Sequence, residues 1–295
     1  MEYVTLRNGV KMPMLGYGVY QVSKSECERC VLDALAIGYR LLDTAQSYFN
    51  EEEVGRAIRR SGVPREEIFL TTKVWIEHYG YEACRASVLA SLEKLGIDHL
   101  DLCLLHQPFS DVYGAYRALE DLYEEGKLRA IGISNFYTDR MVDLACSARI
   151  KPAVNQIEIH PHHAQTEALA WHRTYNIQPE AWAPFGEGRG DMFTLPALLA
   201  IGEKYGKTPA QVILRWHLQR GVVAIPKTTH KERMAENFQI FDFTLSEADM
   251  AAIAALDQKR SAFFSHTDPK MVEWFYRMVE ERKSNTDHKK ETKNW

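Results

Sequence analysis

The sequence predicts an α/β fold, and within that class a (β/α)8 TIM barrel with an N-terminal β-hairpin cap and extra helices. Short apolar runs alternate with longer amphipathic stretches along most of the chain without a linker, which is typical of βαβ units. Residues 100–105 include five apolar residues out of six, as in a strand buried on both faces of a parallel sheet. The length of 295 residues suits a barrel of roughly 250 residues with modest additions.

The N-terminal segment is predicted to form the cap. Residues 3–13 alternate between apolar and polar types around Asn8 and Gly9, a pair that favours the tight turn of a β-hairpin. We expect this hairpin to close the bottom of the barrel, ahead of the first strand at residues 14–18.

The remaining elements follow in order, because apolar runs of four to eight residues suit strands and longer periodic stretches suit helices. Further strands are expected at 40–44, 68–74, 99–105, 129–133, 153–159, 179–184 and 222–225. Helices are expected at 24–37, 50–61, 80–95, 112–126, 138–148, 166–175, 195–205, 209–220 and 231–238. Eight successive units favour a closed barrel over an open doubly wound sheet.

The glycine fingerprint of a dinucleotide-binding Rossmann domain is absent. That fingerprint needs a third glycine three residues after the second. The third position is Gln21 after Gly16 and Gly18, and Asp191 after Gly186 and Gly188.

We expect one barrel domain over residues 1–279 and a charged, flexible tail over residues 280–295. The apolar pattern gives way to charged and polar residues at this boundary.

Bulk composition excludes several classes of partner. The net charge of −4, with 45% hydrophobic and 26% charged residues, gives no general attraction for nucleic acid or for an anionic membrane. The N-terminus has no basic segment leading into an apolar one. Five cysteines are too few for a disulfide scaffold in a chain of this length. We therefore expect a cytoplasmic protein with free thiols. A monomer that acts on a small molecule is also expected.

Ionisable residues stand at the ends of three predicted strands. Asp43 follows residues 40–42, Lys73 follows residues 69–72, and His106 follows residues 100–105. Ligands of parallel α/β folds collect at the carboxyl ends of the strands, so these side chains are predicted to share one site.

The same residues carry a resemblance to the aldo-keto reductase family. Asp43, Tyr48, Lys73 and His106 match the family tetrad in type and order, and residues 132–136, 155–156 and 225–227 match flanking motifs. The chain is similar to bacterial-type members such as 2,5-diketo-D-gluconate reductases. The resemblance implies an NADP-dependent oxidoreductase, acting on the CH–OH group of donors, that reduces aldehydes and ketones to alcohols.

The chemistry of the tetrad fits this activity. Reduction of a carbonyl leaves an alkoxide, so a proton donor must stand at the oxygen. Tyr48 is the expected general acid, although a phenol with a pKa of about 10 is a poor donor unless it is perturbed. Lys73, held by Asp43, is expected to lower that pKa, while His106 orients the substrate oxygen.

The resemblance also implies an NADPH/NADP+ site. The carboxamide is expected to bind Ser134, Asn135 and Gln156, and the nicotinamide ring to stack on Trp182. The 2′-phosphate is expected to bind Lys227, Thr228 and Arg233. The adenine is expected to contact Glu236 and Asn237.

The substrate, a small carbonyl compound, is expected to contact Tyr20, Trp75, His106 and Phe109. The segment after His106 is short, so a comparatively open substrate site is predicted.

Two alternatives remain. A protein of this fold could bind cofactor in a regulatory or structural role without physiological turnover, although an intact tetrad argues against loss of chemistry. The histidines at 160, 162 and 163 suggest a metal, but no carboxylate or cysteine was found to complete a ligand set, and we expect no metal site.

Overall fold

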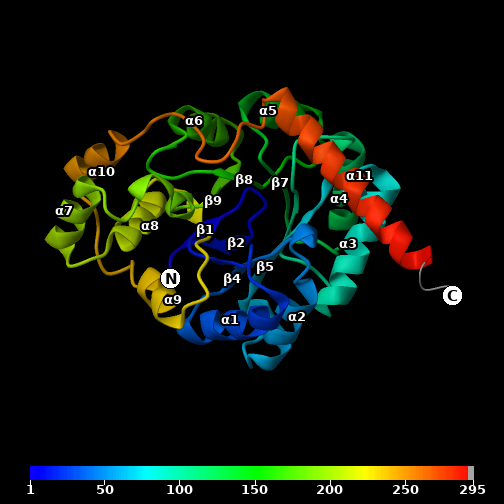
Figure 1. The fold of residues 1–295 in the computed structure, drawn as a ribbon, viewed down its shortest axis with the longest axis horizontal. Helices are drawn as coiled ribbons and strands as arrows, with labels where there is room; N and C mark the ends of the chain where they lie inside the picture. The colour runs from blue at the N-terminus through cyan, green and yellow to red at the C-terminus, as the bar shows by residue number, and fades with distance from the viewer. Residues whose placement is uncertain (292–295) are drawn as a thin grey trace.

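A parallel barrel lies at the centre of the computed structural model, which describes residues 1–291 (Figure 1). Its eight strands neighbour one another in chain order. The first and last are joined by a parallel bridge between Leu15 and Ala224, with Gly16 N donating to Ala224 O at 2.8 Å. The strands are β3 (Tyr17–Gly18), β4 (Leu41–Asp43), β5 (Phe69–Val74), β6 (Leu102–Leu105), β7 (Ile131–Ser134), β8 (Val154–Glu158), β9 (Gln178–Trp182) and β10 (Val223–Ala224).

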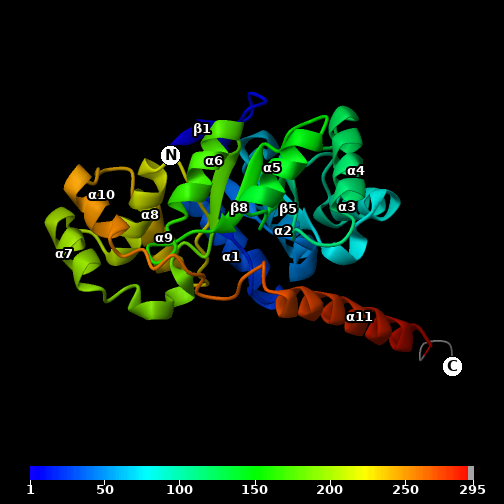
Figure 2. The ribbon, with the colours of Figure 1, turned by 90° about the horizontal axis from the view of Figure 1, so that it is seen from above.

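The predicted hairpin is confirmed. Strands β1 (Tyr3–Thr5) and β2 (Lys11–Pro13) pair antiparallel, and Gly9 has a φ of 86° in the turn, a conformation that favours glycine. The Asn8 side chain donates to the carbonyl of Arg129 at 2.8 Å, which fastens the turn to the barrel. The hairpin lies at the end of the barrel opposite the C-terminal helix (Figure 2).

The helices surround the sheet, and those predicted from the sequence are present within a few residues of their expected bounds. Thr208 illustrates why they begin where they do, because its hydroxyl accepts from Gln211 N while the Gln211 side chain accepts from Thr208 N. The helices are α1 (Lys24–Ile37), α2 (Glu51–Arg60), α3 (Tyr81–Leu95), α4 (Val112–Glu124), α5 (Thr138–Ser147), α6 (Thr166–Tyr175), α7 (Pro196–Tyr205), α8 (Pro209–Gln219) and α9 (Lys231–Phe238).

Two further helices were not placed by the sequence analysis: α10 (Glu247–Ala254) and α11 (Pro269–Glu291). The expected boundary between barrel and tail, at residue 280, falls inside α11. The flexibility of residues 280–295 stays a prediction, and residues 292–295 lie outside the described residues.

Within residues 1–291, no helix combines the length and the apolar character that a membrane crossing requires.

Helices α2 and α3 pack closely at Gly55. A Cβ atom added there would overlap the backbone of Leu95, including its carbonyl oxygen, so the contact requires glycine. We predict that Gly55→Ala lowers the free energy of unfolding by about 1–3 kcal/mol through overpacking. Urea denaturation would measure the loss.

Glu52→Ala is the control, because Glu52 is exposed on the same helix and is likewise replaced by alanine, without adding an atom to the α2–α3 contact. Its effect should stay within about 0.5 kcal/mol. Equal stability of the two variants would mean that the α2–α3 contact relaxes freely.

Candidate active site

The Lys73 ammonium organises the carboxyl ends of β4 and β5. Its Nζ donates to Asp43 Oδ1 at 2.6 Å, to the carbonyl of Thr44 at 3.1 Å and to Tyr48 Oη at 3.2 Å. These acceptors use all three donor positions of the ammonium. The Lys73 side chain is fully buried, so its charge is compensated entirely by protein groups.

Tyr48 is positioned by a short helical turn, η1 (Gln46–Tyr48), that follows β4. The buried side chain of Gln46 fixes this turn by donating to Ser91 Oγ at 3.2 Å and accepting from Trp75 N at 3.0 Å. The Tyr48 hydroxyl is thereby directed at Lys73.

The pKa of Tyr48 reflects two opposing effects, of which the lowering by Lys73 was expected. Burial raises it to about 12, and the Lys73 ammonium only partly offsets this effect. Burial would lower the pKa of Lys73, but the Asp43 carboxylate and the Tyr48 phenol outweigh it, and the net shift is upward. At neutral pH the phenol is protonated and the amine is charged.

His106 lies beside Tyr48 at the end of β6, with their ring centroids 5.7 Å apart. Burial, followed by the nearby charge of Lys73, lowers the pKa of His106 well below its usual value. The imidazole is therefore neutral at physiological pH. The Trp75 ring meets it edge-on at 4.9 Å and limits its orientation.

Behind the tetrad, Gln156 links two carboxyl groups inside the barrel. Its Nε2 donates to Asp43 Oδ2 and to Glu180 Oε2, each at 2.9 Å. Burial, with a smaller contribution from Asp43, raises the pKa of Glu180 to about 8. Glu180, which the sequence analysis did not identify, is therefore mostly protonated at neutral pH and adds little charge beside Lys73.

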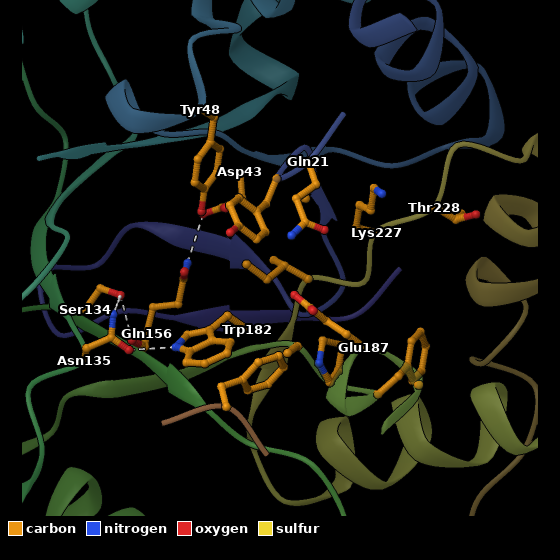
Figure 3. Close-up of a pocket in the computed structure, with 18 of the residues that line it drawn as sticks. Gln21, Asp43, Tyr48, Ser134, Asn135, Gln156, Trp182, Glu187, Lys227 and Thr228 are labelled. Atoms are coloured by element: carbon orange, nitrogen blue, oxygen red, sulfur yellow. Dashed lines mark hydrogen bonds between the residues drawn. The ribbon is translucent and has the colours of Figure 1, made fainter. Parts of the chain in front are cut away.

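A cavity of about 940 Å³ brings together most of the predicted site residues (Figure 3). Lys73 lies behind its wall, in contact with Tyr48. The predicted residues that line it are Tyr20, Asp43, Tyr48, Trp75, His106, Ser134, Asn135, Gln156, Trp182, Lys227, Thr228, Arg233, Glu236 and Asn237.

Phe109 is not among the residues that line this cavity, contrary to its expected contact with substrate. It lines a separate cavity of about 380 Å³ and packs against Phe275, with ring centroids 5.3 Å apart. Gln107 still lines the larger cavity, but the next three residues line the smaller one, which the short segment after His106 did not indicate.

Amide and aromatic groups form one wall of the larger cavity. Trp182 Nε1 donates to Asn135 Oδ1 at 2.8 Å, and Asn135 Nδ2 donates to the carbonyl of His106 at 3.0 Å. Ser134 Oγ donates to the carbonyl of Gln156 at 2.9 Å. The indole is thus held by a hydrogen bond to the residue after β7, two strands away from β9, as Figure 3 shows.

The far end of the cavity is basic. Lys227 and Arg233 are exposed, and within the described residues neither forms an ion pair. The backbone beside them is held by Tyr17, whose hydroxyl donates to the carbonyl of Thr228 at 2.7 Å. Figure 3 places Lys227 and Thr228 on the opposite side of the cavity from Ser134.

The C-terminal segment supplies a wall that the sequence analysis did not foresee. Residues 263–264, His266 and four residues of α11 line the cavity, so it is less open than expected. The spacing of Phe275, Met278 and Arg282 could have indicated this helix, because side chains three and seven residues apart lie on one helix face.

Glu158 anchors this segment to the end of β8. Its carboxylate accepts from Ser261 Oγ at 2.6 Å, from Ala262 N at 2.7 Å and pairs with His160 Nε2 at 2.9 Å. The turn at residues 186–191 also contacts the segment, because Arg189 donates to the carbonyl of Ala262 at 2.7 Å and covers the Phe263 ring.

His160 is therefore engaged in a structural pair with Glu158. Across the part of the chain that the structure describes, no group of three or more His, Cys, Asp or Glu side chains could hold a metal ion.

The sequence was compared with protein families and with known proteins. A model of the aldo/keto reductase family matches residues 12–258. Glyoxal reductase of Bacillus subtilis (strain 168) is 49% identical over 259 residues, which cover 87% of this chain and 93% of that protein. Morphine 6-dehydrogenase of Pseudomonas putida is 46% identical over 268 residues, covering 86% of this chain and 90% of that protein.

Solved structures of aldo-keto reductases have the same fold as this chain. An aldo-keto reductase from a deep-sea metagenome library superposes with a TM-score of 0.88 at 41% identity, covering 90% of this chain and 98% of that one. A Bombyx mori aldo-keto reductase in complex with NADP superposes with a TM-score of 0.84 at 32% identity, covering 89% of this chain and 95% of that one. The chain belongs to the aldo/keto reductase family.

Proposed function

We propose that this protein reduces aldehydes and ketones to alcohols with NADPH, and that Tyr48 is the general acid. The observation that carries the proposal is the contact between the buried Lys73 ammonium and the Tyr48 hydroxyl at the cavity wall. The Bacillus subtilis relative is a glyoxal reductase, which supports carbonyl reduction by this protein.

The cavity residues fit a nicotinamide dinucleotide phosphate. The exposed cations Lys227 and Arg233 suit the 2′-phosphate, and the fixed amide of Asn135 with Ser134 suits a carboxamide. Trp182 presents an indole to the same space. When bound, the nicotinamide supplies the hydride. A homologous Bombyx mori structure contains NADP, which supports the assignment.

The chain's own residues supply the proton and the orientation. Tyr48 holds a proton on Oη, and the neutral His106 stands beside it to hydrogen-bond the substrate oxygen. The Lys73 charge stabilises the tyrosinate that remains after proton transfer, while Asp43 keeps that charge in place.

A turnover assay tests the reaction class. Loss of reduced-nicotinamide absorbance with a panel of aldehydes, α-keto compounds and sugars would support it. Tight NADPH binding without turnover of any carbonyl compound would favour a regulatory or structural cofactor-binding role.

Tyr48→Phe should lower the single-turnover rate of reduction by about 100-fold or more, because general acid catalysis contributes on the order of 10² to 10⁴. NADPH affinity should change little. Tyr20→Phe is the matched control, since Tyr20 lines the same cavity with its ring centroid 5.0 Å from that of Tyr48. If Tyr48→Phe kept more than a third of the wild-type single-turnover rate, Tyr48 would not be the general acid.

The rate of reduction should be nearly constant between pH 6 and pH 9. Tyr48, with its pKa raised to about 12 by burial, keeps its proton throughout this range, and His106 stays neutral because its pKa is lowered. Alcohol oxidation needs the tyrosinate, so its rate should rise with pH. Single-turnover rates in both directions would show this. A reduction rate that falls tenfold across this range would contradict it.

Arg233→Ala should weaken NADPH binding by roughly 10- to 150-fold, the equivalent of one charge-assisted contact of about 1.5–3 kcal/mol. NADH binding should change little, because NADH lacks the phosphate. Titration by quenching of tryptophan fluorescence measures both affinities.

Lys231→Ala is the matched control for charge. Lys231 lies two positions earlier in the chain, outside the cavity, and pairs with Asp33 at 3.2 Å. An equal loss of NADPH and NADH affinity in Arg233→Ala would show that Arg233 supports the fold and does not bind the 2′-phosphate.

A further inference from the structure

Two buried tyrosines lie behind the basic end of the cavity and take no direct part in the chemistry described above. Tyr17 belongs to β3, Tyr39 lies just before β4, and each is only 1% exposed. Their rings meet edge-on, with centroids 6.0 Å apart. Neither side chain lines the cavity, so any effect that they have on a ligand must pass through other residues.

Each of the two phenols donates a hydrogen bond to the backbone of the segment at residues 227–234. Tyr17 Oη donates to the carbonyl of Thr228 at 2.7 Å, and Tyr39 Oη donates to the carbonyl of Met234 at 3.0 Å. Burial raises the pKa of both phenols far above the ordinary value, so both hydroxyls keep the proton that they donate. The two hydrogen bonds therefore fix the backbone near both ends of this segment.

The same segment carries the side chains that suit a 2′-phosphate. Lys227 directly precedes one fixed residue, Thr228, and Arg233 directly precedes the other, Met234. The Thr228 hydroxyl accepts from His230 N at 3.2 Å, which leaves its own proton for a ligand. Each tyrosine thus holds the backbone at or beside a residue that suits the phosphate.

The middle of the segment has less support. Residues 229–233 are half-buried or exposed, and the exposed Arg29 adds a contact to the carbonyl of Thr229 at 3.2 Å. The Tyr39 ring also packs against Phe238 at the end of α9, with centroids 5.0 Å apart. Several cations bind one phosphate well only if they converge on it, and a backbone that is ordered before binding lowers the entropic cost of that convergence.

We propose that Tyr17 and Tyr39 are positioning residues for the cofactor. By fixing both ends of the segment at residues 227–234, they hold Lys227, Thr228 and Arg233 in the arrangement that a 2′-phosphate requires. The two tyrosines thereby contribute to a preference for NADPH over NADH without touching either cofactor. This inference rests on the proposed 2′-phosphate site and extends it to residues buried behind it.

Tyr17→Phe and Tyr39→Phe test the proposal, because each removes one hydroxyl group and keeps the buried ring. Each variant should weaken NADPH binding by roughly 2- to 10-fold, the value of one neutral hydrogen bond. NADH binding should change little, since NADH has no phosphate for the segment to bind. Titration by quenching of tryptophan fluorescence measures both affinities in each variant.

Tyr116→Phe is the matched control. Tyr116 is also 1% exposed, and its hydroxyl donates to a backbone carbonyl, that of Ile150 at 3.0 Å, but neither residue lines the cavity. This variant loses an equivalent hydrogen bond, so its stability in urea should fall by a similar amount. Its ratio of NADPH to NADH affinity should stay that of the wild-type protein.

A tyrosine variant that binds NADPH as tightly as the wild-type protein, or that loses NADPH and NADH affinity equally, would overturn the positioning role of that tyrosine. Arg233→Ala distinguishes this result from failure of the phosphate site. A selective loss of NADPH affinity in Arg233→Ala alone would refute only the role of the tyrosines. If Arg233→Ala left the preference unchanged, the proposed 2′-phosphate site would be wrong, and this inference would fall with it.

Discussion

The contact between Lys73 and Asp43 is the constraint on which the rest of the site depends. A fully buried ammonium is stable only if it is paired, and the carboxylate at 2.6 Å provides the pair. Asp43 is in turn held by Gln156, whose amide also binds Glu180. Four strand ends therefore have to lie in the register of the closed barrel before the Tyr48 hydroxyl has a charged neighbour.

Much of the fold and of the catalytic tetrad could be predicted from the sequence, because the patterns that indicate them are local. Alternating apolar runs and amphipathic stretches located the barrel strands and most helices, and the strand-end positions of Asp43, Lys73 and His106 predicted their meeting. The lowering of the Tyr48 pKa by Lys73 was predicted, but the larger upward effect of burial was not. The sequence shows that a lysine is near, but the energetic cost of burying the phenolate is a property of the packed site.

The C-terminal wall and the position of Phe109 depend on contacts between distant parts of the chain. Glu158 and Ser261 are 103 residues apart, and no local pattern connects them. The boundary expected at residue 280 followed from composition, whereas α11 runs across that position and presents Arg282 to the cavity. Composition describes a segment as a whole, but a helix needs only one apolar face to pack.

The contact of Arg189 with Ala262 and Phe263 joins two segments that line different parts of the cavity. The turn at residues 186–191 contributes Glu187 and Gly188 to its lining, while the C-terminal segment contributes His266. Any ligand that displaces this shared contact changes the free energy of the other segment as well. Such linkage is reciprocal, so the affinity for one ligand is altered by the other to the same extent as the reverse. A single arginine thus joins two walls of the cavity, and a ligand that displaced it would alter the contacts of both segments.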